Sequence, residues 1–148
     1  MVLLRRILVT TDLSEYSLEA MEHASSFSLL YTSRLFLLHV VESDRTRQEA
    51  TEALAVFAAE HLHPEQKVTL VVRSGSAAEE IVRFAREEGI DLIVMATRGR
   101  TGLQHMVLGS VAEKVVRLAG TPVLTVKPKP VGEGILREED VEMELHLR

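Results

Sequence analysis

The chain alternates short apolar runs with longer segments in which apolar residues recur at helical spacing. The runs are rich in β-branched residues and do not alternate with polar residues, which is typical of strands buried on both faces of a sheet. Parallel sheets covered by helices on both sides contain such strands. The pattern therefore predicts a doubly wound α/β domain with right-handed crossovers. The expected strands are residues 7–10, 35–41, 67–72, 91–96 and 123–126.

The segments between these runs are expected to be helices over about residues 15–31, 45–61, 76–88 and 110–119. Two of the expected helix starts fit a capping box, in which a serine and a glutamate three residues later satisfy free backbone amides. The serines are Ser76 and Ser110. The five strands and four helices together predict the order β-α-β-α-β-α-β-α-β.

Charge and composition exclude several classes of protein. The chain has 148 residues, which suits one domain, and a net charge of −5. Residues 131–148 contribute −4 of that charge, so the remaining body carries about −1. This balance argues against a general nucleic-acid-binding surface, which needs clustered Lys and Arg. The sequence has no cysteine, which excludes disulfides and thiolate chemistry.

Hydropathy indicates where the protein resides. No apolar run reaches the 18 or so residues of a membrane helix. At the N-terminus the charges of Arg5 and Arg6 follow a short apolar start, whereas a signal peptide carries its charges first. We therefore expect a cytoplasmic protein with no membrane segment.

Two polar segments follow predicted strands at the edge where such domains bind ligands. They are residues 10–14 and the glycine-containing stretch 96–110. Gly109 and Ser110 lie at an expected helix N-terminus, where free amides and the helix dipole favour an anion such as phosphate. Capping by Ser110 and simple turns at Gly99 and Gly102 would explain the same residues. Neither a Walker A motif nor a G-x-G-x-x-G after the first strand is present, which disfavours P-loop and dinucleotide enzymes.

Three stretches carry a family resemblance. They are Ile7-Leu8-Val9-Thr10-Thr11-Asp12-Leu13-Ser14, Leu37-Leu38-His39-Val40, and Ala96-x2-Gly99-x9-Gly109-Ser110. The last is similar to the nucleotide motif G-x2-G-x9-G-[ST] of the ATP-binding universal stress proteins, with Ala96 in place of the first glycine. The resemblance covers about residues 5–127. It implies a five-stranded sheet of order 3-2-1-4-5 and a nucleotide-binding domain over residues 1–127. Beyond the resemblance, two prolines and two glycines in residues 128–134 predict a linker, so residues 128–148 form a linker and acidic tail.

The resemblance also implies a site for ATP, or for AMP or ADP, with any Mg²⁺ held mainly by the phosphates. Asp12, Thr10 and Thr11 would line the adenine and ribose pocket, and the backbone of Val40 would recognise the adenine edge. Alanine disfavours positive φ, so Ala96 is tolerated if the backbone φ there is negative. The remaining implied cofactor-binding residues are Met95, Ala96, Gly99, Arg100, Gly109, Ser110 and Val111.

The residues favour nucleotide binding over efficient catalysis. Asp12 is the only acidic residue placed in the crevice, and no serine–histidine pair or second carboxylate is evident, so at most slow ATP hydrolysis is expected. Asp12 also fits a capping box with Glu15. His39 reads as a buried histidine with its hydrogen bonds satisfied. His61 and His63 lack the spacing of a helical metal pair, so no metal site is assigned.

The function expected from the resemblance is that of a nucleotide-responsive stress or signalling protein. The alternative is a dimeric interaction module of the same fold that binds no nucleotide. In the family the fifth strand, Val123–Val126, pairs across a two-fold axis, which implies a homodimer. The period-2 pattern of residues 141–147 predicts a further strand that adds to a sheet edge or to another subunit; a disordered acidic tail is the alternative.

Overall fold

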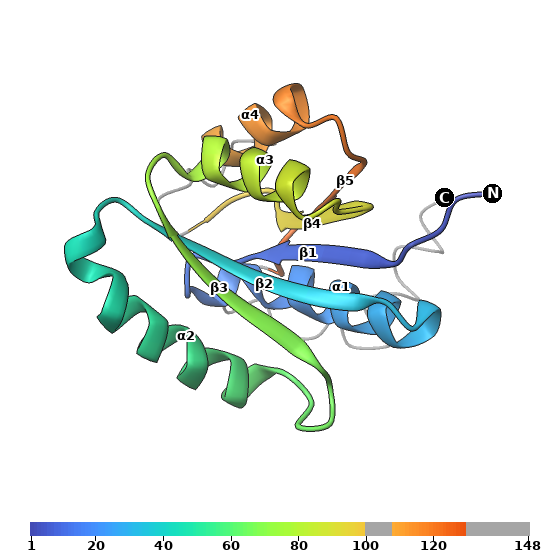
Figure 1. Cartoon of the computed structure of the whole chain (residues 1–148), viewed down its shortest axis with the longest axis horizontal. Coiled ribbons are helices and arrows are strands. Elements are labelled where there is room, and N and C mark those ends of the chain that lie inside the picture. The colour runs from blue at the N-terminus through green and yellow to red at the C-terminus, as the bar shows by residue number, and fades with distance from the viewer. Residues whose placement is uncertain (100–107, 130–148) are drawn as a thin grey trace, which may run out of the picture.

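The chain forms one parallel sheet with strand order β3-β2-β1-β4-β5. The computed structural model describes residues 1–99 and 108–129. Figure 1 shows the sheet edge-on between its helices. The predicted fold and strand order are confirmed. The strands are β1 (Arg6–Thr10), β2 (Arg34–Val41), β3 (Val68–Ser74), β4 (Leu92–Ala96) and β5 (Val123–Val126).

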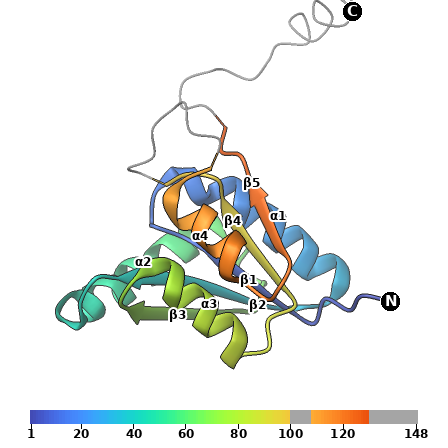
Figure 2. The same ribbon diagram turned by 90° about the horizontal axis from the view of Figure 1, so that it is seen from above.

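Helices cover both faces of the sheet. In Figure 1, α3 (Ala77–Glu87) and α4 (Ser110–Leu118) lie above it, whereas α1 (Leu18–Tyr31) and α2 (Arg47–His61) lie below. Figure 2 shows the same sandwich from above. All four helices run antiparallel to the strands that they connect, as right-handed crossovers require. The carboxyl ends of the strands therefore meet the N-termini of the helices at one edge of the sheet.

Alternate residues of each central strand face opposite layers. In β1, Ile7 and Val9 pack against α1 and α2, whereas Leu8 packs against α3 and α4, and all three are fully buried. In a strand successive side chains point to opposite faces, so a strand covered on both sides must be apolar throughout. This two-sided burial explains the uninterrupted apolar runs of the sequence.

The first turn of two predicted helices is tighter than expected. Short 3₁₀ turns, η1 (Glu15–Ser17) and η2 (Asp44–Thr46), precede α1 and α2. In η1 the Ser17 N–H donates to the Ser14 carbonyl at 3.2 Å, the i→i+3 bond of a 3₁₀ turn. Such turns are frequent at helix N-termini, and hydrophobic spacing does not distinguish them from the helix that follows.

The predicted capping boxes are wrong in detail. Gly109, not Ser110, is the N-cap of α4, and Ser110 is its first residue. Ser76 is the N-cap of α3, but its side chain makes no capping hydrogen bond. The Gly109 N–H instead donates to the Thr97 carbonyl, so the approach of two loops sets where α4 begins. The alternating segment 141–147 lies outside the described residues.

Candidate functional site

A cavity of about 750 Å³ opens at the carboxyl edge of the sheet. Its walls come from the ends of β1, β2 and β4, from the turn after β3, and from the first residues of α3 and α4. Arg100 lies outside the described residues. Segments far apart in the sequence thus meet at the place expected for a ligand. The predicted site residues that line the cavity are Thr10, Thr11, Asp12, Val40, Met95, Ala96, Gly99, Gly109, Ser110 and Val111.

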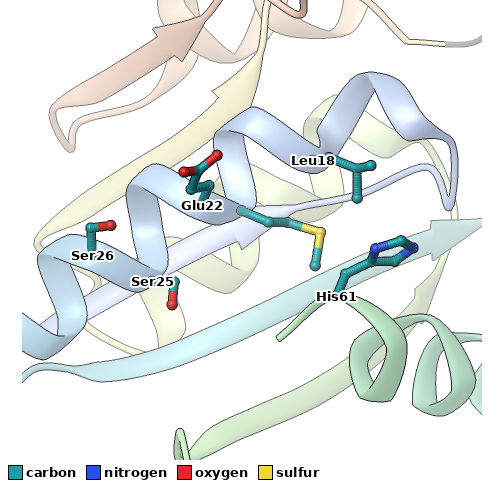
Figure 3. Close-up of a pocket in the computed structure, with 6 residues that line it drawn as sticks. Leu18, Glu22, Ser25, Ser26 and His61 are labelled. Carbon is teal, nitrogen blue, oxygen red and sulfur yellow. The ribbon is translucent and has the colours of Figure 1, made fainter. Parts of the chain in front are cut away.

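A second, smaller cavity of about 270 Å³ lies between α1 and the end of α2. Figure 3 shows His61 reaching in from α2, opposite the residues of α1 that line the other wall, which include Leu18, Glu22, Ser25 and Ser26. Ser25 donates to Gln66, and the His61 ring packs at 4.7 Å from Phe57. Because its polar groups do not converge, we assign no function to this cavity.

Thr11 anchors the loop after β1. Its backbone N–H donates to the Leu38 carbonyl at 3.0 Å, and its side-chain oxygen is 2.7 Å from the hydroxyl of Ser17. The same oxygen accepts the Leu13 N–H at 2.9 Å. Thr11 is only 7% exposed. These bonds hold the loop against the sheet and present Asp12 at the cavity.

Asp12 forms a local turn as well as lining the cavity. Its Oδ1 accepts the Ser14 N–H at 3.0 Å and also the Ser14 hydroxyl. The 3₁₀ turn begins at Glu15 with Ser14 as its N-cap, so Asp12 lies ahead of the helix and does not cap it. The predicted capping box with Glu15 is therefore wrong, and the carboxylate closes an Asx turn instead.

Leu13 has φ of +64°, in the left-handed region that disfavours a branched, bulky residue. In the described chain only Leu13 and Thr32 combine a side chain with positive φ. Leu13 packs against the buried cluster of α1 and α2, and this contact holds it in place. The residue next to Asp12 is thus kept in a strained conformation by its surroundings.

Ala96, the departure from the motif, sits in regular strand. It ends β4, pairs with Val126 of β5, and is not among the positive-φ residues. The backbone at this position therefore does not require glycine. Ala96 therefore lines the cavity without backbone strain.

Gly99 and Gly109 are needed for space. A Cβ at position 99 would lie 2.6 Å from Asp12 Oδ2. A Cβ at position 109 would lie 3.0 Å from the Thr97 carbonyl oxygen and 3.4 Å from Arg98 Cα. Close approach of three segments explains both glycines, and it places the N-terminus of α4 directly on the cavity.

The charged groups of the cavity come from three loops. Arg98 lines it, and its guanidinium lies 5.0 Å from the ring centre of Tyr16, which joins the β4 loop to η1 by a cation–π contact. Asp12 and Glu42 supply carboxylates. Within residues 1–99 and 108–129, no three His, Asp or Glu side chains group to hold a metal.

The wall formed by the start of α3 is missing from the predicted site. Gly75, Ser76 and Ala77 line the cavity, and the Gly75 N–H donates to the Val41 carbonyl at 2.8 Å. The Ser-Gly-Ser turn after the third strand is the sequence signal that identifies this wall, because every parallel strand ends at the same edge. Glu42 is likewise absent from the predicted binding residues.

A buried carboxylate on α3, that of Glu80, forms ion pairs next to the wall made by Gly75, Ser76 and Ala77. The Glu80 carboxylate, with a side chain 10% exposed, pairs with Arg83 and lies 3.8 Å from Arg73. Gly75, with φ of +139°, passes so close that a Cβ there would be 3.2 Å from Glu80. The loop conformation and the ion pairs therefore depend on each other.

Two residues of β2 that the sequence analysis singled out, His39 and Val40, also line the cavity. His39 lines it, and its Nδ1 is 2.8 Å from the Thr11 carbonyl oxygen. The prediction of a buried histidine is wrong, because His39 is half-buried, although its Nδ1 has a hydrogen-bond partner. Val40 is half-buried beside it.

No helix among the described residues is long and apolar enough to cross a membrane.

Sequence and structure comparisons agree on one family. A family model, the universal stress protein family, matches residues 4–127. Universal stress protein MJ0531 of Methanocaldococcus jannaschii is 35% identical, with 88% of this chain and 86% of that protein covered. The solved structure of MJ0577 from the same organism has a TM-score of 0.78 at 32% identity, with 87% and 99% covered.

A more distant structure shares the fold. It is a universal stress protein of Archaeoglobus fulgidus solved in complex with dAMP, with a TM-score of 0.67 at 19% identity. The match covers 86% of this chain and all of that one. The family model spans most of the chain, and MJ0531 exceeds 30% identity over nearly its whole length. The chain therefore belongs to the universal stress protein family.

Proposed function

We propose that the carboxyl-edge cavity binds an adenine nucleotide, ATP or its shorter relatives ADP and AMP, and that the protein is a nucleotide-responsive stress or signalling protein. The observation that carries the proposal is convergence: motif residues from the β1 loop, the end of β2 and the β4–α4 segment line one cavity. A volume of about 750 Å³ suits a ligand of this size. The dAMP complex of a relative with the same fold supports the ligand class.

In this proposal the nucleotide lies along the edge with its base toward β2 and its phosphates toward α4. Thr10, Thr11, Asp12 and the Val40 backbone contact the adenosine. Gly99, Gly109, Ser110 and Val111 contact the phosphates, because the free amides and dipole of the α4 N-terminus stabilise anions. Any Mg²⁺ is held mainly by the phosphates and neutralises them when ATP is bound.

Arg98 offers the phosphates a further contact. Its guanidinium already stacks on Tyr16, so part of its conformational entropy is lost before the ligand arrives. The carboxylate of Glu42, which follows β2, opposes a high density of phosphate charge on that side of the cavity. This charge pattern supports the orientation with the phosphates at the α4 side.

Binding of labelled ATP and AMP to the purified protein tests the proposal. Saturable binding, a rise in melting temperature with ATP and Mg²⁺, and adenine nucleotide released on denaturation of the native protein are the expected results. Absence of saturable binding at millimolar nucleotide would overturn it.

The second candidate function is a dimeric interaction module without nucleotide. The presence of Ala96 on the cavity wall is the observation that favours it, since the motif has glycine there. Ala96→Gly separates the two. If neither the natural protein nor A96G gains melting temperature with ATP and Mg²⁺, the interaction module is the better description. If A96G alone binds, the methyl group is what blocks the ligand.

We also propose that a second copy pairs with the edge formed by β5. This strand ends the sheet, and Val123, Leu124 and Val126 are half-buried in the single chain. Uncovered strand edges are usually paired or protected. Sedimentation over a range of concentrations should show a dimer, and a concentration-independent monomer would refute the pairing. Removing residues 131–148 tests whether the tail contributes to that assembly.

A further inference from the structure

Strand β2 holds both backbone groups of Thr11. The Thr11 N–H donates to the Leu38 carbonyl at 3.0 Å, and the Thr11 carbonyl oxygen lies 2.8 Å from His39 Nδ1. A carbonyl oxygen only accepts, so Nδ1 must carry the hydrogen of this bond. When His39 is neutral its tautomer is therefore Nδ1–H.

The bond from His39 to the Thr11 carbonyl lies just beyond the last residue pair between β1 and β2. The register of β1 with β2 ends at Thr10 opposite Leu38, and the chain then turns away toward Asp12. A buried carbonyl beyond the ladder needs another partner, and His39 supplies it. Two residues further on, Leu13 has φ of +64°, so the turn is held against its own strain.

The contacts continue from Thr11 to the opposite wall. Thr11 Oγ1 accepts the Leu13 N–H, and Asp12 Oδ1 accepts the Ser14 N–H. Asp12 Oδ2 then lies against Gly99, where a Cβ would be 2.6 Å away. A shift of the Thr11 carbonyl would displace the carboxylate that faces the β4 loop.

We propose that His39 is a positioning residue: its Nδ1–H holds the Thr11 carbonyl and thereby sets the Asp12 carboxylate against Gly99. The consequence for ligand affinity rests on the proposed nucleotide function. The competing role for His39, which lines the cavity, is direct contact with the ligand through Nε2.

Two substitutions separate these roles by geometry. In His39→Asn the side-chain amide nitrogen is attached at Cγ, as Nδ1 is, and can still donate to Thr11. In His39→Gln the amide nitrogen is one bond further out, where Nε2 lies, and the Thr11 bond is lost. We expect H39N to keep AMP and ATP affinity within about twofold of the natural protein, and H39Q to lose about threefold to tenfold, the equivalent of one hydrogen bond. Equal affinities for both variants, or weaker binding by H39N than by H39Q, would overturn the proposal.

His23 provides the matched control. Its Nδ1 lies 2.7 Å from the Glu19 carbonyl oxygen, a contact of the same kind on the exposed side of α1 and outside the cavity lining. Neither H23N nor H23Q should change nucleotide affinity. A loss in H23Q as large as that in H39Q would mean that the effect is not specific to the site, and would also overturn the proposal.

Nuclear magnetic resonance gives a readout that needs no nucleotide. In ¹⁵N-histidine-labelled protein at a pH where His39 is neutral, we expect the Nδ1–H tautomer, and in H39Q we expect shifted amide signals for Leu13 and Ser14 that H39N restores. An Nε2–H tautomer, or unchanged loop amides in H39Q, would refute the positioning role. If the natural protein fails to bind nucleotide, the proposed function fails, and these spectra still decide the role of His39.

Discussion

The carboxylate of Asp12 lies so close to the backbone of Gly99 that a Cβ at position 99 would stand 2.6 Å from Oδ2. One residue follows the first strand and the other follows the fourth. The contact joins the two loops at the point where the strand order reverses, which is where doubly wound sheets bind ligands. It explains the preference for glycine at position 99 without any demand from backbone φ.

Gly99→Ala should separate ligand binding from stability. The atom in its way is the end of a side chain, so Asp12 can swing aside at the cost of its bonds to Ser14, roughly 1 kcal/mol of unfolding free energy. Displacement of Asp12 is expected to weaken nucleotide binding about tenfold. Titration calorimetry and urea unfolding measure the two effects.

Gly120→Ala is the control for this change. A Cβ at position 120 would meet nothing within 4 Å, so both affinity and stability should stay close to those of the natural protein. Unchanged nucleotide affinity in G99A would show that the position of Asp12 does not matter for the ligand.

Gly109→Ala should damage stability more than G99A does. Here the Cβ would meet backbone, the Thr97 carbonyl oxygen at 3.0 Å and Arg98 Cα at 3.4 Å, and backbone cannot rotate away. We expect a loss of about 1–3 kcal/mol of unfolding free energy, the usual cost of overpacking. Denaturant unfolding of G109A beside G120A measures it, and equal stability of the two variants would contradict the close approach seen at α4.

At position 13 the glycine variant should be more stable than the alanine variant, which is the reverse of the usual order of stability. Both L13A and L13G lose the packing of the leucine side chain, but only glycine accepts φ of +64° without steric cost. L13G should therefore be more stable than L13A by roughly 0.5–1 kcal/mol. Thr32, with φ of +54° at the end of α1, should show the same order in T32G and T32A with no change in ligand affinity. Higher stability of L13A would argue against strain next to Asp12.

Glu80→Gln tests the ion pairs behind the α3 wall. The buried carboxylate pairs with Arg83 and approaches Arg73, so its loss should cost about 1–3 kcal/mol. Glu79→Gln removes an acid of the same helix whose side chain is 57% exposed and 3.4 Å from Lys114, and should cost less than about 1 kcal/mol. Equal costs in urea unfolding would show that burial of Glu80 adds nothing.

Local pattern in the sequence determined the elements and the edge of the sheet that carries the site. Uninterrupted apolar runs such as Leu35–Leu38 follow from burial on both faces, and the polar residues after β1 and β4 mark the carboxyl edge. The family motif further predicted Gly99 and Gly109 as residues of the candidate site, and both line the cavity. These features depend on neighbours in the chain, so they are visible without the fold.

Only the tertiary structure decided what depends on contacts between distant segments. The start of α4 at Gly109 is set by the Thr97 backbone, and the α3 wall reaches the cavity because α3 and α4 pack on the same face. The stacking of Arg98 on Tyr16 and the bond from His39 to Thr11 likewise join different strands and loops. Hydrophobic periodicity and capping depend on residues a few positions apart in the sequence. The contacts named here form only when the sheet brings the ends of its strands together.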